Sequence, residues 1–268
     1  MKKYNFDKIA NSYENKAVVQ KTAAEKLLNY LEVRKNSGVL DLGCGVGNIT
    51  EKIAKLTQGQ IVAMDKSVNM LKQAKKRLKN YKNIKFQLKG GEELSSSNKF
   101  DIIFCNSVLQ WFEYPEVVLA KCYKALKVGG QIAIQAPATK NYCPNFIKVI
   151  SKVEKDPLAG KIFAKFKSPW FFLDTAKEYS QLLKSVGFEI SLAKIVREKS
   201  KYSLVESFEI FSSGAAAGYF NQAYYSVELF EDYLKKFKQI VKQSLSEQSN
   251  THKEVELVFN RIYLVANK

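Results

Sequence analysis

The sequence predicts an α/β fold with a doubly wound, Rossmann-like parallel sheet, and three observations lead to this expectation. Short apolar segments alternate with helical segments between about 37 and 137, at the spacing of right-handed βαβ units. These short segments are continuous apolar runs, as is typical of strands that are covered on both faces. Two further apolar segments follow in the C-terminal part of the chain, and they fit an edge hairpin beside the parallel strands.

The elements of the core follow from periodicity and from turn residues. A first helix is expected over 16–33, where apolar residues recur at helical spacing until Ser37-Gly38. Asn48 and Ser67 are the expected N-caps of the next two helices, and Gly129-Gly130 are expected to close a later one. In chain order, the core elements after the first helix are strand 39–42, helix 48–56, strand 61–64, helix 68–78, strand 84–88, strand 101–104, helix 115–126 and strand 131–135.

The second half of the chain is expected to be less regular. Residues 138–172 contain three of the five prolines and many aromatic residues, and we expect an irregular lid there. The expected elements that follow are helix 175–186, strand 188–196, helices 203–213 and 226–245, and strand 255–265.

Composition excludes several classes of protein. The hydrophobic fraction of 46% and charged fraction of 26% are those of a globular protein, not of a disordered or collagenous one. The four cysteines lack CxxC spacing and His252 is the single histidine, so no metal site is expected. We see no apolar run long enough for a membrane span and no signal peptide after Met-Lys-Lys, which predicts a cytoplasmic protein.

The formal net charge of +17 permits two interpretations. A field of this sign favours an acidic partner, such as nucleic acid, an anionic membrane or an acidic protein. However, only four of the 43 basic residues are arginine, and lysine is spread along nearly the whole chain. Arginine binds phosphate through two parallel hydrogen bonds, and lysine does not. Because arginine is scarce here, a lysine-rich genome explains the same composition without a nucleic-acid partner.

A glycine-rich turn carries the main functional signal. Asp41-Leu42-Gly43-Cys44-Gly45-Val46-Gly47 follows the first strand and opens the next helix, and its glycines let the backbone approach a ligand closely. The spacing is GxGxG, which differs from the dinucleotide GxGxxG and argues against a dehydrogenase. Asp65 stands at the end of the second strand, where an acidic residue can accept both hydroxyls of a ribose.

Four segments together resemble the class I S-adenosylmethionine-dependent methyltransferases. VLDLGCGVGNIT (39–50) and VAMDKSVNML (62–71) are similar to the first two motifs of that family, and DIIFCNSVLQWF (101–112) and LKVGGQIAIQAP (126–137) to the motifs of its fourth and fifth strands. The resemblance implies a seven-stranded sheet with an antiparallel last strand. It also implies S-adenosylmethionine as the cofactor.

The resemblance further implies contacts with that cofactor. Gly43 and the adjoining loop face its methionine part, Asp65 holds the ribose, and Asn106 lies beside the sulfonium. Gly90 stands where the family often has an acidic residue toward the adenine, so Glu92 or a backbone group takes that place. The complete expected set is Asp41, Gly43, Gly45, Gly47, Asp65, Lys66, Met70, Glu92, Asn106 and Tyr13. Two roles are open for Tyr13: it closes over the cofactor, or it only fixes the N-terminal helix.

The chain contains no Gly/Ser-rich linker, so we expect one methyltransferase domain over 1–268. Within it, 1–36 is expected as an N-terminal helical cover, 37–137 as the cofactor-binding core, 138–175 as a lid or insertion, and 176–268 as C-terminal helices and edge strands.

Two subfamily resemblances compete for the methyl acceptor. FDKIANSYENKAVVQ (6–20) is similar to the start of malonyl-acyl-carrier-protein O-methyltransferases of biotin synthesis, whereas SPWFFLDTAKEYSQLLKSVGF (168–188) and FNRIYLVANK (259–268) are more similar to trans-aconitate methyltransferase. Both subfamilies methylate a carboxylate. The first implies an acidic acyl carrier protein as partner; oligomeric state stays open.

A carboxylate acceptor also suits the residues available. It is deprotonated at neutral pH, so no general base is required, and positioning can lower the barrier by ~7–11 kcal/mol in favourable cases. Neutral donors orient a carboxylate without a salt bridge, and Gln110, Trp111 and Gln20 are the candidates. For Trp111, a role as a core aromatic that packs against the following helix is equally expected. An RNA or tRNA methyltransferase is the alternative that the charge suggests, but the sequence shows no appended RNA-binding module, no Asn-Pro-Pro-Tyr motif and no Cys nucleophile motif.

Overall fold

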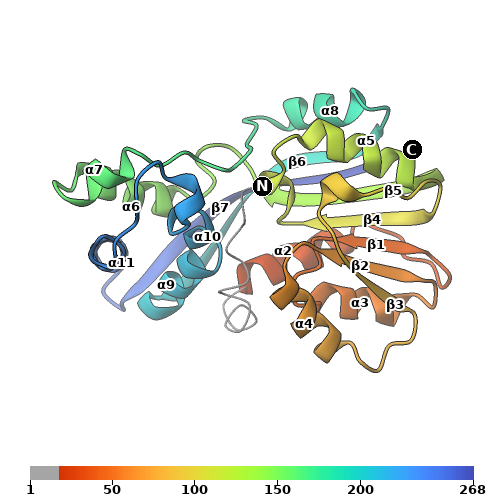
Figure 1. The fold of residues 1–268 in the computed structure, drawn as a ribbon, viewed down its shortest axis with the longest axis horizontal. Coiled ribbons are helices and arrows are strands. Elements are labelled where there is room, and N and C mark those ends of the chain that lie inside the picture. Colours follow the sequence, from red (N-terminus) through yellow and green to blue (C-terminus); the bar gives the residue numbers. More distant parts are fainter. Residues whose placement is uncertain (1–17) are drawn as a thin grey trace. The chain divides into compact units, whose positions relative to one another are not determined.

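The computed structural model describes residues 18–268, with side chains from residue 22 onward. Within this range the chain forms a seven-stranded sheet in the order β3-β2-β1-β4-β5-β7-β6 (Figure 1). The strands are β1 (Val39–Leu42), β2 (Ile61–Asp65), β3 (Ile84–Leu88), β4 (Phe100–Asn106), β5 (Leu126–Pro137), β6 (Glu189–Ser203) and β7 (Glu254–Asn267).

The strand pairing confirms the predicted fold class. β1 pairs in parallel with β2 on one side and with β4 on the other, while β2 also pairs in parallel with β3, and β4 with β5. β7 pairs antiparallel with β5, from Gln131 opposite Asn267 to Pro137 opposite Arg261. The chain leaves β1 in one direction and returns to β4 on its other side. This reversal is the topological switch point beside which open α/β sheets bind ligands.

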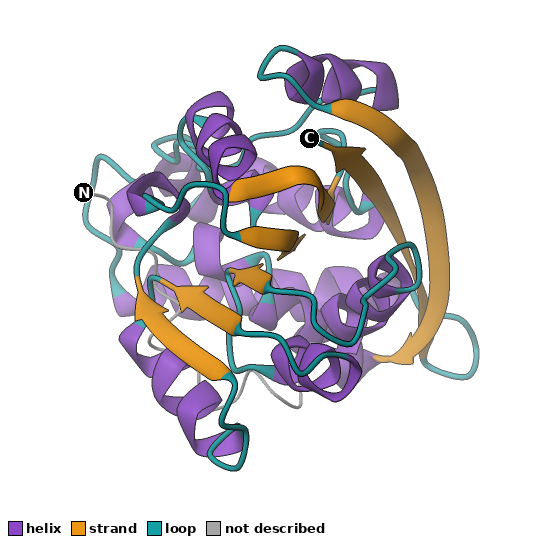
Figure 2. Cartoon of the chain, turned by 90° about the vertical axis from the view of Figure 1, so that its right-hand side faces the viewer, coloured by secondary structure: helices purple, strands orange, loops and turns teal. Residues whose placement is uncertain are grey.

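The contacts divide the described chain into two compact units. The sheet unit holds 18–140, 170–196 and 261–268, and the helical unit holds 141–169 and 197–260. The expected organisation as one domain stays a prediction. β6 and β7 each continue from one unit into the other, and Figure 2 shows two long curved strands side by side, one of which ends at the C-terminus.

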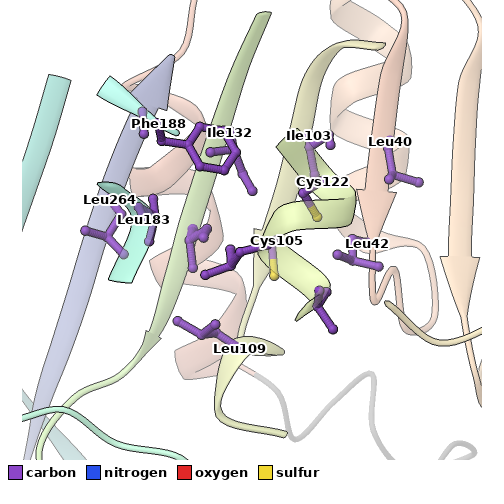
Figure 3. Close-up of a cluster of buried hydrophobic side chains, with 14 of the residues drawn as sticks. Leu40, Leu42, Ile103, Cys105, Leu109, Cys122, Ile132, Leu183, Phe188 and Leu264 are labelled. Atoms are coloured by element: carbon purple, nitrogen blue, oxygen red, sulfur yellow. The ribbon is translucent and has the colours of Figure 1, made fainter. Parts of the chain in front are cut away.

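Helices cover both faces of the sheet unit. α2 (Val18–Leu28), α3 (Asn48–Leu56) and α4 (Val68–Arg77) lie on one face, and α5 (Pro115–Ala125) and α8 (Ala176–Lys184) on the other (Figure 1). The first face buries Ala24, Leu27 and Ile53 against the strands. The second face buries Cys122 and Leu183 against Ile103, Ile132 and Leu264 (Figure 3). Removal of this apolar surface from water stabilises the unit by about 25 cal/mol per Å².

The helical unit corrects one expectation. Residues 138–172 were expected to be irregular, but they contain α6 (Pro144–Lys155) and α7 (Ala159–Phe163). Pro144 occupies the first turn of α6, where proline is tolerated because that N–H has no helical partner. The remaining helices of this unit are α9 (Leu204–Ser213), α10 (Ala216–Tyr219), η3 (Gln222–Tyr224) and α11 (Glu231–Glu247).

The aromatic residues of that region form part of the core of the helical unit. Phe163 stacks on Phe166 at 5.3 Å, and Phe146 meets the edge of Phe211 at 5.1 Å. Phe237 has no exposed surface. These side chains therefore stabilise the unit through burial and through ring-edge contacts.

Three smaller expectations also need correction. Gly47, in the left-handed conformation, is the N-cap of α3, and Asn48 is its first residue. Gly129-Gly130 lie within β5 rather than closing a helix. The helix expected over 226–245 begins only at Glu231. Ser67 caps α4 as predicted, because its side chain accepts a hydrogen bond from the Met70 N–H at 3.1 Å.

Candidate functional site

The glycine-rich turn is fixed to the neighbouring strand by its own backbone. The N–H groups of Gly43 and Cys44 both donate to the Met64 carbonyl, at 2.8 and 3.0 Å. Gly43, Gly45 and Gly47 have φ of 75°, 55° and 84°, in the region that favours glycine. The turn therefore has one defined path from the end of β1 into α3.

The three glycines of the turn face different surroundings. A Cβ on Gly43 would lie 2.2 Å from Val108 Cγ2, and one on Gly47 would lie 2.9 Å from Leu78 Cδ1. A Cβ on Gly45 would meet nothing within 4 Å. Gly43 and Gly47 are thus required for packing inside the protein, and Gly45 is where the backbone borders open space that a ligand can enter.

Asp65 ends β2 directly beside this turn. Its Oδ2 accepts a hydrogen bond from the Gly45 N–H at 2.9 Å, and its Oδ1 accepts one from the Ser67 N–H at 2.9 Å. Burial raises the pKa of the carboxyl, and the N–H donors of Ser67 and Gly45 oppose that shift. Each carboxylate oxygen keeps a further acceptor position, so the half-buried carboxylate fits the expected ribose contact.

Asp41 lies deeper, within β1, and is 3% exposed. Its Oδ2 accepts a 2.6 Å hydrogen bond from the Thr50 hydroxyl of α3. Burial raises the pKa of Asp41 to about 7, while the Thr50 hydrogen bond lowers it and the charge of Asp65 adds to the rise. Its predicted part in cofactor binding stays a prediction.

The other residues expected near the cofactor follow β2 and β3. Met70 is buried in the first turn of α4, and Lys66 is exposed next to Asp65. Glu92 lies exposed in η1 (Gly91–Glu93). A Cβ on Gly90 would lie 2.9 Å from Glu92 Oε2, so glycine at 90 leaves room for that carboxylate. Glu92 thus stands next to the position that the family often gives to an acid.

Two polar residues beside the predicted Asn106 were missed by the sequence analysis, Ser107 after β4 and Gln135 in β5. Asn106, the last residue of β4, is half-buried, and Ser107 follows with φ of 57°. Ser107 donates from its N–H to the Gln135 carbonyl at 2.7 Å and from its hydroxyl to Gln135 Oε1 at 3.0 Å. The available signal was a glutamine near the end of an otherwise apolar strand, in the position that pairs with Asn106.

Gln110 and Trp111 are both 6% exposed, in η2 (Leu109–Trp111). Gln110 Nε2 donates to the Ser107 carbonyl at 2.9 Å, which leaves its second proton for another acceptor. Trp111 meets the edge of Trp170 at 5.8 Å. The segment at Trp170 thus contacts the residues expected to orient the acceptor.

Two further predicted residues cannot be placed. Tyr13 lies outside the described residues, and Gln20 lies on α2 where only the backbone is described. The structure thus brings Asp65 and the Gly45 backbone together at the end of the sheet, and links Gln110 to Ser107 beside Asn106. The contacts that all of these residues make with ligands stay predictions.

Residues 18–268 contain neither a metal-binding cluster nor a membrane-spanning helix. That range contains no group of three His, Cys, Asp or Glu side chains able to hold a metal ion. It also contains no helix with the length and apolar character that a bilayer crossing demands. Cys44, Cys105, Cys122 and Cys143 are buried and form no disulfide.

Comparison with known proteins places the chain among methyltransferases. A family described as "Methyltransferase domain" matches residues 33–260. A malonyl-[acyl-carrier protein] O-methyltransferase of Ilyobacter polytropus is 33% identical over 140 residues, 52% of each chain. A trans-aconitate 2-methyltransferase of Deinococcus radiodurans is 30% identical over 61% of this chain and 63% of its own. The chain spans about half the length of the first of these relatives.

Solved structures share the fold. A protein of Bacillus halodurans assigned as a methyltransferase superposes with a TM-score of 0.62 at 16% identity, over 92% of this chain and 99% of its own. An N-methyltransferase of Haemonchus contortus with bound S-adenosylhomocysteine superposes with a TM-score of 0.53 at 17% identity, over 94% of this chain and 53% of its own. At sequence identities this low, the superpositions show a shared fold only.

Proposed function

The chain belongs to the methyltransferase-domain family and has S-adenosylmethionine as its cofactor, and from this premise we propose that it esterifies a carboxylate. When bound, S-adenosylmethionine supplies an electrophilic methyl group. The GxGxG turn, with open space at Gly45, and the Asp65 carboxylate would hold it. The protein's remaining task is to orient the acceptor and to exclude water.

One observation carries the choice of a carboxylate. The polar residues from the end of β4 to the end of η2 are neutral: Asn106, Ser107, Gln110 and Trp111. Burial raises the pKa of the Cys105 thiol well above its usual value, so that thiol stays protonated at neutral pH. His252 is exposed in the helical unit. A carboxylate needs no base because it is already ionised, whereas most oxygen and nitrogen acceptors must lose a proton.

The acceptor that the relatives favour is the malonyl group of an acyl carrier protein. Several relatives at 32–37% identity carry the name malonyl-[acyl-carrier protein] O-methyltransferase, and an acidic carrier would meet a chain of net charge +17. A small free acid such as trans-aconitate is the second candidate, which the Deinococcus relative supports.

Base lability of the product tests the proposed function. The protein is incubated with methyl-labelled S-adenosylmethionine and either malonyl-acyl-carrier protein or trans-aconitate, and the product is then treated with mild alkali. We expect label on one acid that is released as methanol, because an ester hydrolyses in base. Label that survives the alkali contradicts a carboxylate acceptor.

A further inference from the structure

Gln135 is a buried amide next to the residue that ends β4. It lies in β5 in register with Asn106 on one side and with Tyr263 of β7 on the other, and it has no exposed surface. Phe104 and Ala133, two residues earlier in each strand, belong to the apolar cluster beneath α2. Because side chains alternate along a strand, Asn106 and Gln135 continue the same face of the sheet toward the carboxyl ends of the strands.

The hydrogen bonds of Gln135 leave one group unused. Its Oε1 accepts from the Ser107 hydroxyl at 3.0 Å, which fixes the direction of the amide. Its Nε2 is buried and has no hydrogen-bond partner among the described residues. A buried donor without a partner costs free energy, and the cost is recovered when a ligand supplies an acceptor there.

Ser107 holds this arrangement in a backbone conformation that is rare for serine. Its φ of 57° lies in the left-handed region. Besides its two bonds to Gln135, its carbonyl accepts from Gln110 Nε2 at 2.9 Å. Residues kept in such conformations by several contacts are frequent at functional sites.

A buried positive charge shares this face. Arg261 is 4% exposed and pairs with Pro137, two positions beyond Gln135, and the alternation of β7 places it on the same side as Tyr263. Arg261 therefore places a guanidinium group on the same face of the sheet as the Gln135 amide.

We propose that Gln135 Nε2 donates a hydrogen bond to the acceptor carboxylate, and that Ser107 is the positioning residue that aims it. This rests on the proposed function, because it assigns the orientation of the carboxylate. A neutral amide suits this role, since it orients the nucleophilic oxygen and leaves its charge intact.

Steady-state kinetics of matched variants test the proposal. Gln135→Met removes the donor at similar volume, and Gln131→Met is its control. Gln131 lies on the same strand and face, but its amide donates to Asn267 Oδ1 at 2.8 Å. With the acid that the wild type esterifies, we expect Gln135→Met to lower kcat/KM about 10- to 100-fold, the effect of one hydrogen bond to a charged group. Cofactor affinity should stay within about 2-fold of wild type, as should every parameter of Gln131→Met.

Ser107→Gly gives an independent measurement. It removes the hydroxyl and relieves the positive φ. If Gln135→Met fails to bind cofactor, Ser107→Gly is compared with wild type alone: a lower acceptor kcat/KM at unchanged cofactor affinity supports the proposal, and an unchanged kcat/KM contradicts it. We expect a loss of acceptor kcat/KM that does not add to that of Gln135→Met in the double variant, because Ser107 acts through Gln135. Additive losses would show a merely structural role and would contradict the positioning assignment.

Two results overturn the proposal in distinguishable ways. In the first, the wild type esterifies its acid, and Gln135→Met binds cofactor and esterifies the same acid with an equal kcat/KM. The assignment of Gln135 is then wrong, while the proposed function stands. If the wild type esterifies neither malonyl-acyl-carrier protein nor trans-aconitate, the proposed function is wrong, and this assignment with it.

Discussion

Two aspartates on neighbouring strands differ in how their carboxyl groups are surrounded. Asp65 is half-buried and accepts from two backbone N–H groups, whereas Asp41 is 3% exposed and accepts from the Thr50 hydroxyl. Since backbone donors stabilise the ionised form and burial opposes it, Asp65 is the better ligand acceptor. Asp41 is better suited to link β1 to α3.

Replacement of Asp65 tests its role toward the cofactor. Asp65→Ala removes the charged acceptor from the ribose, so we expect cofactor binding to weaken by ~1.5–3 kcal/mol for each hydrogen bond lost. Asp101→Ala is the control. Asp101 accepts from the Gly38 N–H at 2.7 Å and pairs with Lys127 near the start of β4. Calorimetric titration with S-adenosylhomocysteine measures both variants, and unchanged affinity in Asp65→Ala would rule out the ribose contact.

The raised pKa of Asp41 makes a prediction about stability and pH. Its folded-state pKa of about 7 lies above the ordinary 3.8, so the folded protein binds a proton more tightly than the unfolded chain does. The contribution of Asp41 to stability therefore declines as pH rises from about 4 to about 7. Asp41→Asn abolishes this titration. Between pH 5 and 8, its unfolding free energy should rise relative to wild type by about 2–3 kcal/mol.

Urea unfolding of both proteins at pH 5 and pH 8 measures this difference. Asn at position 41 can still accept from the Thr50 hydroxyl, so the comparison isolates the charge. An equal gap between the two proteins at both pH values would mean that Asp41 titrates near its ordinary pKa.

At the scale of elements, the parallel core was predictable because its signals are local. Short apolar runs such as 39–42 and 61–64 are buried on both faces, and the structure has β1 and β2 there. The helix over 144–155 is not predictable from composition, because proline and aromatic residues are also typical of an irregular loop. Pro144 in fact begins that helix, and Phe146 packs in the core.

Only the residues expected to bind the cofactor were predictable from the sequence, and the arrangement of the residues expected to orient the acceptor was not. The GxGxG turn and Asp65 are adjacent along the chain to the strands that position them. The pairing of Ser107 with Gln135 depends on strand register across 28 residues of chain, which no local pattern encodes. The Trp170 segment also contacts η2, since Trp170 meets the Trp111 ring and the Phe171 N–H donates to the Gln110 carbonyl at 2.9 Å, and no local pattern encodes these contacts.

The turn after β1 makes a prediction about two glycines with different tasks. Gly43→Ala would place a methyl group 2.2 Å from Val108 at positive φ, so we expect a loss of stability of about 2–4 kcal/mol from overpacking and strain. Gly45→Ala meets no atom within 4 Å, so only strain of about 1–2 kcal/mol applies, while the methyl group enters the space expected for the cofactor.

Thermal unfolding and cofactor titration separate these effects. Gly43→Ala should lose mainly stability, and Val108→Ala in the same chain should recover part of it. Gly45→Ala should lose mainly cofactor affinity. If both variants lost affinity and stability in the same proportion, the division of tasks within the turn would be contradicted.

At the scale of the whole molecule, the net charge of +17 is the property that no single site explains. Lysine provides nearly all of the positive charge, and lysine is a flexible point charge that attracts an acidic surface without specific geometry. Such a field raises association rates more than it raises affinity for one arrangement. The net charge therefore helps to decide whether the methyl acceptor is a small acid or an acid carried by an acidic protein.

The salt dependence of the reaction distinguishes the two candidate acceptors. The Debye length falls from about 10 Å at 0.1 M salt to about 3 Å at 1 M, so attraction between two charged proteins is largely screened across this range. If the acceptor is carried by an acidic protein, kcat/KM for malonyl-acyl-carrier protein should fall steeply as salt rises. The value for trans-aconitate should fall much less, because a small acid meets fewer charges. Equal, flat dependences, with carrier-bound malonate no better than the free acid, would contradict a carrier partner and leave the small acid as the substrate.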